Sequence, residues 1–202
     1  MSRLLETIKV ENGKMKLLNL HQERLDNSRQ ELFDTPPPID LSKEIQVPAF
    51  AEKGIFKCRV EYNERIEKIE FLPYKIRKIE SLQIVDGGKI DYQFKYADRF
   101  PLRLLFERKK HADDIIIIKN GLVTDSFYAN LAFLKKGIWF TPKSPLLKGV
   151  QRRFLLSKKT IQVADISIES LPSFEKIRLF NAMISWEDQI DVTSIYPLTK
   201  TN

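Results

Sequence analysis

Alternation of apolar and polar residues predicts that the chain opens with a β-hairpin and continues into a helix. Two β-rich runs within "LLETIKVENGKMKLLN" are joined by Glu11, Asn12 and Gly13, and Asn-Gly between such runs is a strong hairpin signal. The next segment, "NLHQERLDNSRQELF", has leucines at helical spacing, with Asn19 as the expected N-cap. Three prolines at 36–38 end this helix, and a short helical stretch follows to about residue 51, broken at Pro48.

A second hairpin is predicted from "GIFKCRVEY" and "RIEKIEFLPY", which alternate apolar and polar residues on either side of Asn63 and Glu64. The following text, "KIRKIESLQIVDGG", is partly strand-like and ends in an Asp-Gly-Gly turn at 86–88. We place a domain boundary between about residues 76 and 88, which gives an N-terminal α+β domain at 1–80 and a C-terminal domain at 81–202.

The second half also mixes strands and helices. A strand is expected through Lys95, followed by a helix over roughly 98–110. Further strands are expected in "DIIIIK", "LVTD", "NLAFLKKGIWFTP", "IQVADISI", "KIRLFNAMI" and "DQIDVTSIYPL", with a helix at "VQRRFLLSKK". The pattern therefore predicts an α+β protein of two domains.

Composition narrows the class of protein. Hydrophobic residues make up 43% and charged residues 30% of the 202 positions, as in an ordinary globular protein. The longest apolar run is short and charge appears early at the N-terminus, so we expect no membrane span, no export signal and a cytoplasmic location. With one cysteine, Cys58, and two histidines, we expect neither an intrachain disulfide nor a metal site.

The net charge of +7 is compatible with two kinds of partner. Nucleic acid rewards clustered Lys and Arg, but here the basic residues are scattered and interleaved with Asp and Glu. Small anions such as phosphates and carboxylates suit the same charge. We therefore expect a small-molecule partner and no nucleic acid.

One lysine stands in an unusual setting. In "IDYQFKYADRF", three aromatic residues alternate with Gln93 and Lys95, so a strand would place Lys95 on the face opposite the aromatics. By periodicity alone, Lys95 would solubilise a wet face, because lysine is rarely buried without a reason.

Several motifs together change this interpretation. "FKYADR" is followed by "HADDIIIIKNGLVTDSFYANLAF", "GIWFTPKSPLLKGVQRRFLL" and "LFNAMI", while the chain opens with a Glu-Thr hairpin and a His-x-x-Arg-Leu helix. In this order the motifs resemble the class IV pyridoxal-phosphate enzymes, which include branched-chain and D-amino-acid aminotransferases and 4-amino-4-deoxychorismate lyases. The resemblance implies a two-domain class IV aminotransferase-like fold, with a small N-terminal α/β sandwich and a C-terminal β-barrel-like domain with flanking helices.

The resemblance also implies roles at the cofactor, pyridoxal 5'-phosphate (PLP). Lys95 would hold PLP as an imine and then act as the base and acid that moves protons. The family has a glutamate near the ring nitrogen in a Val-Thr-Glu motif, whereas this chain has Asp125, which is one methylene shorter. Asn130 matches an asparagine of the same strand and would orient its neighbours.

The PLP phosphate would be bound by backbone amides and a cation. The turn at Gly149 and the first-turn amides of Val150 and Gln151 have the expected form, although many relatives carry threonine in place of Gln151. Two further matches are the second phosphate loop, at Asn181 and Ala182, and the phosphate-binding arginine, Arg24.

The reaction is less determined than the cofactor, because a shared fold does not fix the chemistry. "FNAMI" and the residue at 151 favour the aminodeoxychorismate lyase branch, which eliminates pyruvate and leaves 4-aminobenzoate, as in folate biosynthesis. The alternatives are an aminotransferase acting on branched-chain or D-amino acids, and a cofactor-less binding protein on the same fold.

Arginine is the expected ligand for the carboxylates of an anionic amino substrate. Arg59 is the first candidate, followed by Arg99 and Arg65. Relatives usually carry an additional N-terminal strand and a longer loop where this chain turns at Asn63-Glu64, so we expect a shortened protein with a more open pocket. By the same resemblance we expect a homodimer.

Overall fold

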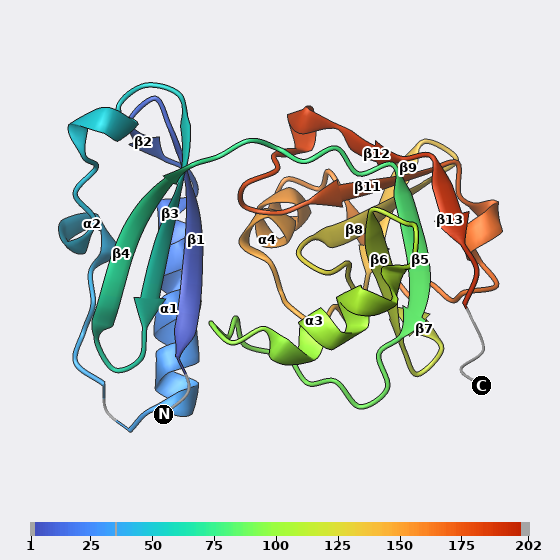
Figure 1. Cartoon of the computed structure of the whole chain (residues 1–202), viewed down its shortest axis with the longest axis horizontal. Helices are drawn as coiled ribbons and strands as arrows, with labels where there is room; N and C mark the ends of the chain where they lie inside the picture. The colour runs from blue at the N-terminus through green and yellow to red at the C-terminus, as the bar shows by residue number, and fades with distance from the viewer. Residues whose placement is uncertain (1–2, 35, 199–202) are drawn as a thin grey trace. The chain divides into compact units, whose positions relative to one another are not determined.

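The computed structural model describes residues 3–34 and 36–198, and its contacts divide the chain into two compact units. Unit 1 comprises residues up to Ile76 together with Phe94–Asp98, and unit 2 comprises Arg77–Gln93 and the chain from Arg99 onward. Figure 1 shows both units, in which thirteen strands and a few short helices are described. The fold is α+β, as the sequence predicted.

Unit 1 is built on a four-stranded antiparallel sheet of order β2-β1-β3-β4. Both predicted hairpins are confirmed, since β1 turns into β2 at Asn12 and Gly13, and β3 turns into β4 around Asn63. Alternation places every second residue of β1 on the core side, where Leu4, Ile8 and Val10 are buried. The strands are β1 Leu4–Glu11, β2 Lys14–Met15, β3 Ile55–Tyr62 and β4 Ile66–Pro73.

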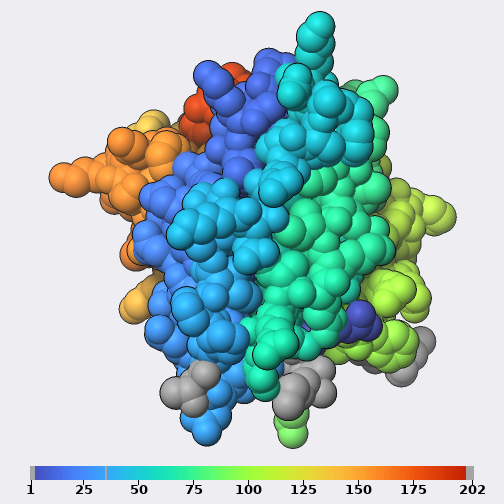
Figure 2. Space-filling view, turned by 90° about the vertical axis from the view of Figure 1, so that its left-hand side faces the viewer, coloured from blue at the N-terminus to red at the C-terminus, as the bar shows by residue number. Residues whose placement is uncertain are grey.

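Helix α1, Leu18–Leu32, packs on the core side of this sheet through the fully buried Leu25. The helix begins earlier than predicted: its N-cap is Leu17, in a left-handed conformation with φ 52°, so the prediction of Asn19 as the cap is wrong. Figure 2 shows the segment that follows the helix lying between α1 (blue) and β4 (green). This segment holds α2, Leu41–Glu44, and a 3-10 turn, Ala49–Ala51, and it adds Leu41 and Ile45 to the core.

Arg29 ties two loops of unit 1 together from the end of α1. Its side chain is buried, and its guanidinium donates hydrogen bonds to the backbone carbonyls of Asn63, Pro37 and Glu64. The triple-proline segment and the β3–β4 turn are therefore both attached to the same cation.

Residues 94–98 belong to unit 1 although they follow the first strand of unit 2. The Leu5 amide donates to the Lys95 carbonyl at 2.8 Å, and the Ala97 amide donates to the Arg3 carbonyl at 2.9 Å. Only an isolated bridge between Leu4 and Tyr96 forms, so the strand predicted through Lys95 is wrong. The segment is short and irregular because its backbone partners lie at the very start of β1.

Unit 2 contains two sheets, of order β10-β9-β8-β11-β12 and β13-β5-β6-β7. Strands β5 and β6 run parallel, and the connection between them includes α3, Phe100–Phe106, and a 3-10 turn, Glu107–Lys109. The strands are β5 Ser81–Asp86, β6 Asp114–Lys119, β7 Leu122–Val123, β8 Asn130–Lys135, β9 Ile138–Pro142, β10 Gln162–Ala164, β11 Lys176–Phe180, β12 Ile190–Val192 and β13 Ser194–Tyr196.

Both sheets of unit 2 enclose one core, to which β5 and β6 contribute Leu82 and Ile116 and β8 contributes Leu131 and Phe133. Ala132, between the last two, points to the other side of its sheet and packs with Leu155 of α4, Val150–Ser157. This arrangement matches the predicted barrel-like domain with flanking helices. Two 3-10 turns, Leu171–Ser173 and Trp186–Asp188, complete the unit. Within residues 3–34 and 36–198, no helix is long and apolar enough to cross a membrane.

Candidate active site

Lys95 lies in the irregular segment of unit 1, and its side chain is half-buried. Main-chain bonds to β1 fix its backbone, as described above. Phe94 is 8% exposed and its ring meets Tyr96 edge-on at 6.0 Å between centroids, so the aromatic residues anchor the segment on both sides of the lysine. The alternating aromatic residues thus position the segment, although the segment is not a strand.

A buried cluster in unit 1 contains the predicted phosphate ligand, Arg24. The Arg24 Nε donates to Glu6 Oε1 at 2.8 Å and its Nη2 donates to Glu6 Oε2 at 2.5 Å. His21 Nδ1 lies 2.5 Å from the same Oε2. Glu6 and His21 are both 0% exposed. Arg24 is thus held bidentately by Glu6, the glutamate of the Glu-Thr hairpin, to which the sequence had assigned no role.

The charges in this cluster follow from burial and from the neighbours of each group. Burial alone would raise the pKa of Glu6, but Arg24 and His21 outweigh it and lower the pKa to about 2. Burial lowers the pKa of His21, with the cations of Arg24 and Lys95 acting in the same direction and Glu6 opposing them. At neutral pH the cluster therefore holds an ionised Glu6, a cationic Arg24 and a neutral His21 that donates through Nδ1.

In unit 2, Asp125 follows β7 and is bound on both carboxylate oxygens. Asn130 Nδ2 donates to Oδ1 at 2.6 Å, and the Leu147 amide donates to Oδ2 at 2.9 Å. The same Asn130 Nδ2 also donates to the Leu147 carbonyl at 3.0 Å. Asn130, at the start of β8, therefore connects Asp125 to the loop that leads into α4.

Asp125 is buried, and burial raises the pKa of its carboxyl to about 7 even though Leu147, Asn130 and Arg152 oppose the shift. A carboxylate offers about four acceptor positions, so its capacity for hydrogen bonds exceeds the two bonds described above. A protonated ring nitrogen placed here would supply a donor and a compensating positive charge.

The N-terminus of α4 adjoins this carboxylate. Gly149 is the N-cap, with no side-chain capping bond, and the buried Val150 and Gln151 occupy the first turn. A Cβ on Gly149 would lie 2.1 Å from Asn130 Oδ1, so any larger residue would require Asn130 or the turn to shift. The first-turn amides of a helix have no partner within the helix and attract anions such as phosphate.

Asn181 shapes the loop after β11. Its Oδ1 accepts from the amides of Met183 and Ile184 at 2.7 and 2.9 Å, and its Nδ2 donates to the Tyr128 carbonyl at 3.1 Å. The side chain therefore orders the loop that contains Ala182. Its place in a phosphate loop stays a prediction.

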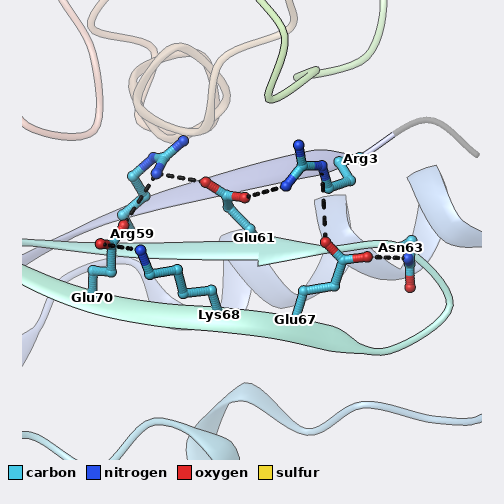
Figure 3. A network of polar contacts seen from close by, with 7 residues as sticks. All are labelled: Arg3, Arg59, Glu61, Asn63, Glu67, Lys68 and Glu70. Carbon is cyan, nitrogen blue, oxygen red and sulfur yellow. Dashed lines mark hydrogen bonds and ion pairs between the residues drawn. The ribbon is translucent and has the colours of Figure 1, made fainter.

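Two of the three arginines proposed for the substrate carboxylate, Arg59 and Arg99, are engaged within their own units. Figure 3 shows Arg59 in a network on β3 and β4, where its Nη1 lies 2.5 Å from Glu61 Oε1 and 3.1 Å from Glu70 Oε2. In unit 2, Arg99 donates to the Phe127 carbonyl and stacks 4.2 Å above the Phe127 ring. Each would have to bind a substrate while keeping these partners, and both roles stay predictions.

Two residues of the cluster around Arg24 have a signal in the sequence. Glu6 occupies the same alternation phase as Leu4 and Ile8, so a charged residue stands where β1 should present an apolar one to the core. His21 lies one turn before Leu25 on the buried face of α1. A charge and a histidine at core positions indicate a buried polar cluster. The Leu147 amide, a backbone group, has no comparable signal.

Comparisons with known proteins define the family. The pattern of the family described as amino-transferase class IV matches residues 93–188. A Haemophilus influenzae protein described as uncharacterized is 37% identical over 182 residues, covering 89% of this chain and 97% of that protein. A Haemophilus somnus structure, described as a "putative 4-amino-4-deoxychorismate lyase", has 35% identity and a TM-score of 0.86, and covers 92% of this chain and 98% of that one.

A more distant structure shares the fold. A hypothetical aminotransferase from Mycobacterium tuberculosis, in its PLP-bound form, has 16% identity and a TM-score of 0.77, with 96% of this chain and 81% of that chain covered. The chain belongs to the class IV aminotransferases, a family of PLP-dependent enzymes.

The residues present fit this cofactor. Within unit 2, the buried Asp125 carboxylate and the N-terminus of α4, which has no side-chain cap, are groups of the kinds that bind a protonated ring nitrogen and a phosphate. Within unit 1, Arg24 and Lys95 are groups of the kinds that bind a phosphate and form an imine. Asp125 replaces the glutamate expected for the family, and its carboxylate is fixed through Asn130 and Leu147. Each unit therefore carries groups whose chemistry suits this cofactor.

Proposed function

We propose that this protein is a PLP-dependent lyase that converts 4-amino-4-deoxychorismate into 4-aminobenzoate and pyruvate. The observation that carries this proposal is the 35% identity, over 92% of the chain, with the Haemophilus somnus structure described above. The "FNAMI" segment and Gln151 give independent support from the sequence, as they resemble the lyase branch of the family.

Each residue contributes a defined part of the chemistry. Arg24 of unit 1 and the first-turn amides of α4 in unit 2 would each bind the phosphate, and the Asp125 carboxylate would accept a hydrogen bond from the ring nitrogen and so keep that nitrogen protonated. Bound PLP supplies an electron sink that stabilises negative charge on the substrate. Lys95 would hold the cofactor through its Nζ, and the same Nζ, as a free amine, would remove the substrate proton whose loss precedes cleavage of the C–O bond.

An aminotransferase acting on branched-chain or D-amino acids is the second candidate. The fold shared with the Mycobacterium tuberculosis aminotransferase favours it, because both reactions use one cofactor site. In that reaction the Lys95 Nζ would take up and hand on the proton of the substrate α-carbon, and a keto acid would be required as amino acceptor.

Product analysis separates the two reactions. The purified protein is incubated with 4-amino-4-deoxychorismate alone, and separately with pairs of amino and keto acids. Pyruvate and 4-aminobenzoate released without an amino acceptor support the lyase, whereas amino-group exchange without this release contradicts it.

Covalent attachment at Lys95 is tested separately. After PLP loading and borohydride reduction, mass spectrometry should find the label on the peptide with Lys95 in the wild type and in Lys89→Ala, whose lysine is exposed. Lys95→Ala should carry no label and should lose at least about 10³-fold in activity, because no other base replaces the amine. A colourless wild-type protein that takes no label would contradict PLP chemistry altogether.

A further inference from the structure

Glu6 is the most deeply buried charge of unit 1 that the reaction itself does not use. It lies on the core side of β1 and is 0% exposed, yet it is ionised, with a pKa lowered to about 2. Three hydrogen bonds reach it, two from Arg24 and one from His21. Removing a carboxylate from water to this extent is costly unless such bonds compensate.

The geometry indicates what Glu6 does for Arg24. A guanidinium has five N–H donors in one plane, and the two bonds to Glu6 fix both the position and the rotation of that plane. The three donors that do not bond to Glu6 then point in set directions. His21 Nδ1 lies 2.5 Å from Glu6 Oε2 and restrains the carboxylate in turn.

The charge of Glu6 and its orienting contact with Arg24 would have opposite effects on phosphate binding. A negative carboxylate beside Arg24 reduces the attraction of that arginine for a phosphate dianion. If Glu6 matters only through its charge, its removal should tighten phosphate binding. If Glu6 matters because it orients Arg24, its removal should weaken phosphate binding.

We propose that Glu6 is a positioning residue for the phosphate of the cofactor: with His21 behind it, it holds the Arg24 guanidinium in the orientation that binds the phosphate. This inference rests on the proposed role of Arg24 in PLP binding and adds the residue that determines how well Arg24 performs it.

The test compares two ligands that differ only in the phosphate. Dissociation constants for PLP and for pyridoxal are measured by absorption titration on the wild type, Glu6→Gln and Glu6→Asp. Glutamine removes the charge, and aspartate keeps it but shortens the reach by one methylene. We expect both variants to bind PLP about tenfold more weakly, because Arg24 loses the orientation in which it binds the phosphate, while pyridoxal binding changes little.

Arg24→Gln and a control complete the design. Arg24→Gln should lose the same preference for PLP over pyridoxal, and adding Glu6→Gln to it should have no further effect, because the two residues act as one unit. Glu67→Gln is the matched control, since Glu67 also pairs with an arginine of unit 1, Arg3, but lies on β4 (Figure 3). The Glu67→Gln variant should prefer PLP over pyridoxal as strongly as the wild type does.

The outcomes separate the inference from the proposed function. A wild type that binds neither ligand covalently would overturn the proposed function. PLP binding that is weakened by Arg24→Gln, but tightened or unchanged in Glu6→Gln and Glu6→Asp, would overturn the inference alone. An equal loss of PLP and pyridoxal affinity would also overturn it, since that is the signature of general unfolding. If Glu6→Gln does not fold, Glu6→Asp decides the question.

Discussion

The pKa of Asp125 makes a specific prediction about stability and pH. Burial raises this pKa from an ordinary value of 3.8 to about 7 in the folded protein. Between these values the folded state binds more protons than the unfolded state, so the contribution of Asp125 to the free energy of unfolding falls as pH rises from about 4 to about 7.

Asp125→Asn removes this dependence. In cofactor-free protein, we compare the free energy of unfolding of the variant with that of the wild type. The difference, variant minus wild type, should rise with pH over this window. The rise is at most about 4 kcal/mol, because each pKa unit corresponds to about 1.36 kcal/mol. Urea unfolding at several pH values measures the difference. Asp165→Asn, at an exposed aspartate, should show no such trend. A constant difference for Asp125→Asn would contradict the raised pKa.

At the residue scale, sequence and structure agree where a motif is local. Asp125, Asn130 and Gly149 were singled out from the sequence, and the structure connects them through two hydrogen bonds of Asn130 and one close approach. The partners of Arg24 and Arg59 were not predicted. Glu6 is 18 positions from Arg24 and Glu70 is 11 from Arg59, and only the folded sheet brings these charges together.

At the element scale, the hairpins were predictable because their turns are encoded locally. Asn12-Gly13 adopts positive φ at both residues, as the hairpin requires. The segment around Lys95 was not predictable in the same way. Its alternating aromatic residues are typical of a strand, but a strand also needs a partner strand to pair with. Here only one isolated bridge forms, between Tyr96 and Leu4 of β1.

The contact between β8 and α4 gives a prediction at the same scale. Gly149→Ala would place a Cβ against Asn130 Oδ1, at 2.1 Å in the unrelaxed geometry. Relief of this contact must move Asn130 away from Asp125 or move the start of α4, and overpacking of this kind costs about 1–3 kcal/mol.

Thermal denaturation should therefore show a lower midpoint for Gly149→Ala, together with weaker PLP binding. Lys148→Ala, at the exposed neighbouring position, serves as the control and should change neither quantity. An alanine variant with unchanged stability and affinity would show that the loop before α4 adapts freely.

At the scale of the whole molecule, we propose a homodimer, on the basis of the family resemblance. Light scattering at two concentrations should give a mass of twice the 23.7 kDa of one chain. The mass should persist when PLP is released with hydroxylamine and then removed by dialysis. A mass of one chain at both concentrations would contradict the proposal.

The hydrogen bonds that Arg29 donates to two loops of unit 1 should persist at low pH. Its three acceptors are backbone carbonyls, which do not take up protons in the range where carboxylates do. The ion pair between Arg24 and Glu6 disappears once Glu6 is protonated, below a pH of about 2, whereas the bonds from Arg29 to the triple-proline segment do not depend on any titrating partner. The triple-proline segment is therefore attached by bonds that tolerate acid better than the ion pair of the buried cluster does. This segment should be among the last parts of unit 1 to loosen as pH falls.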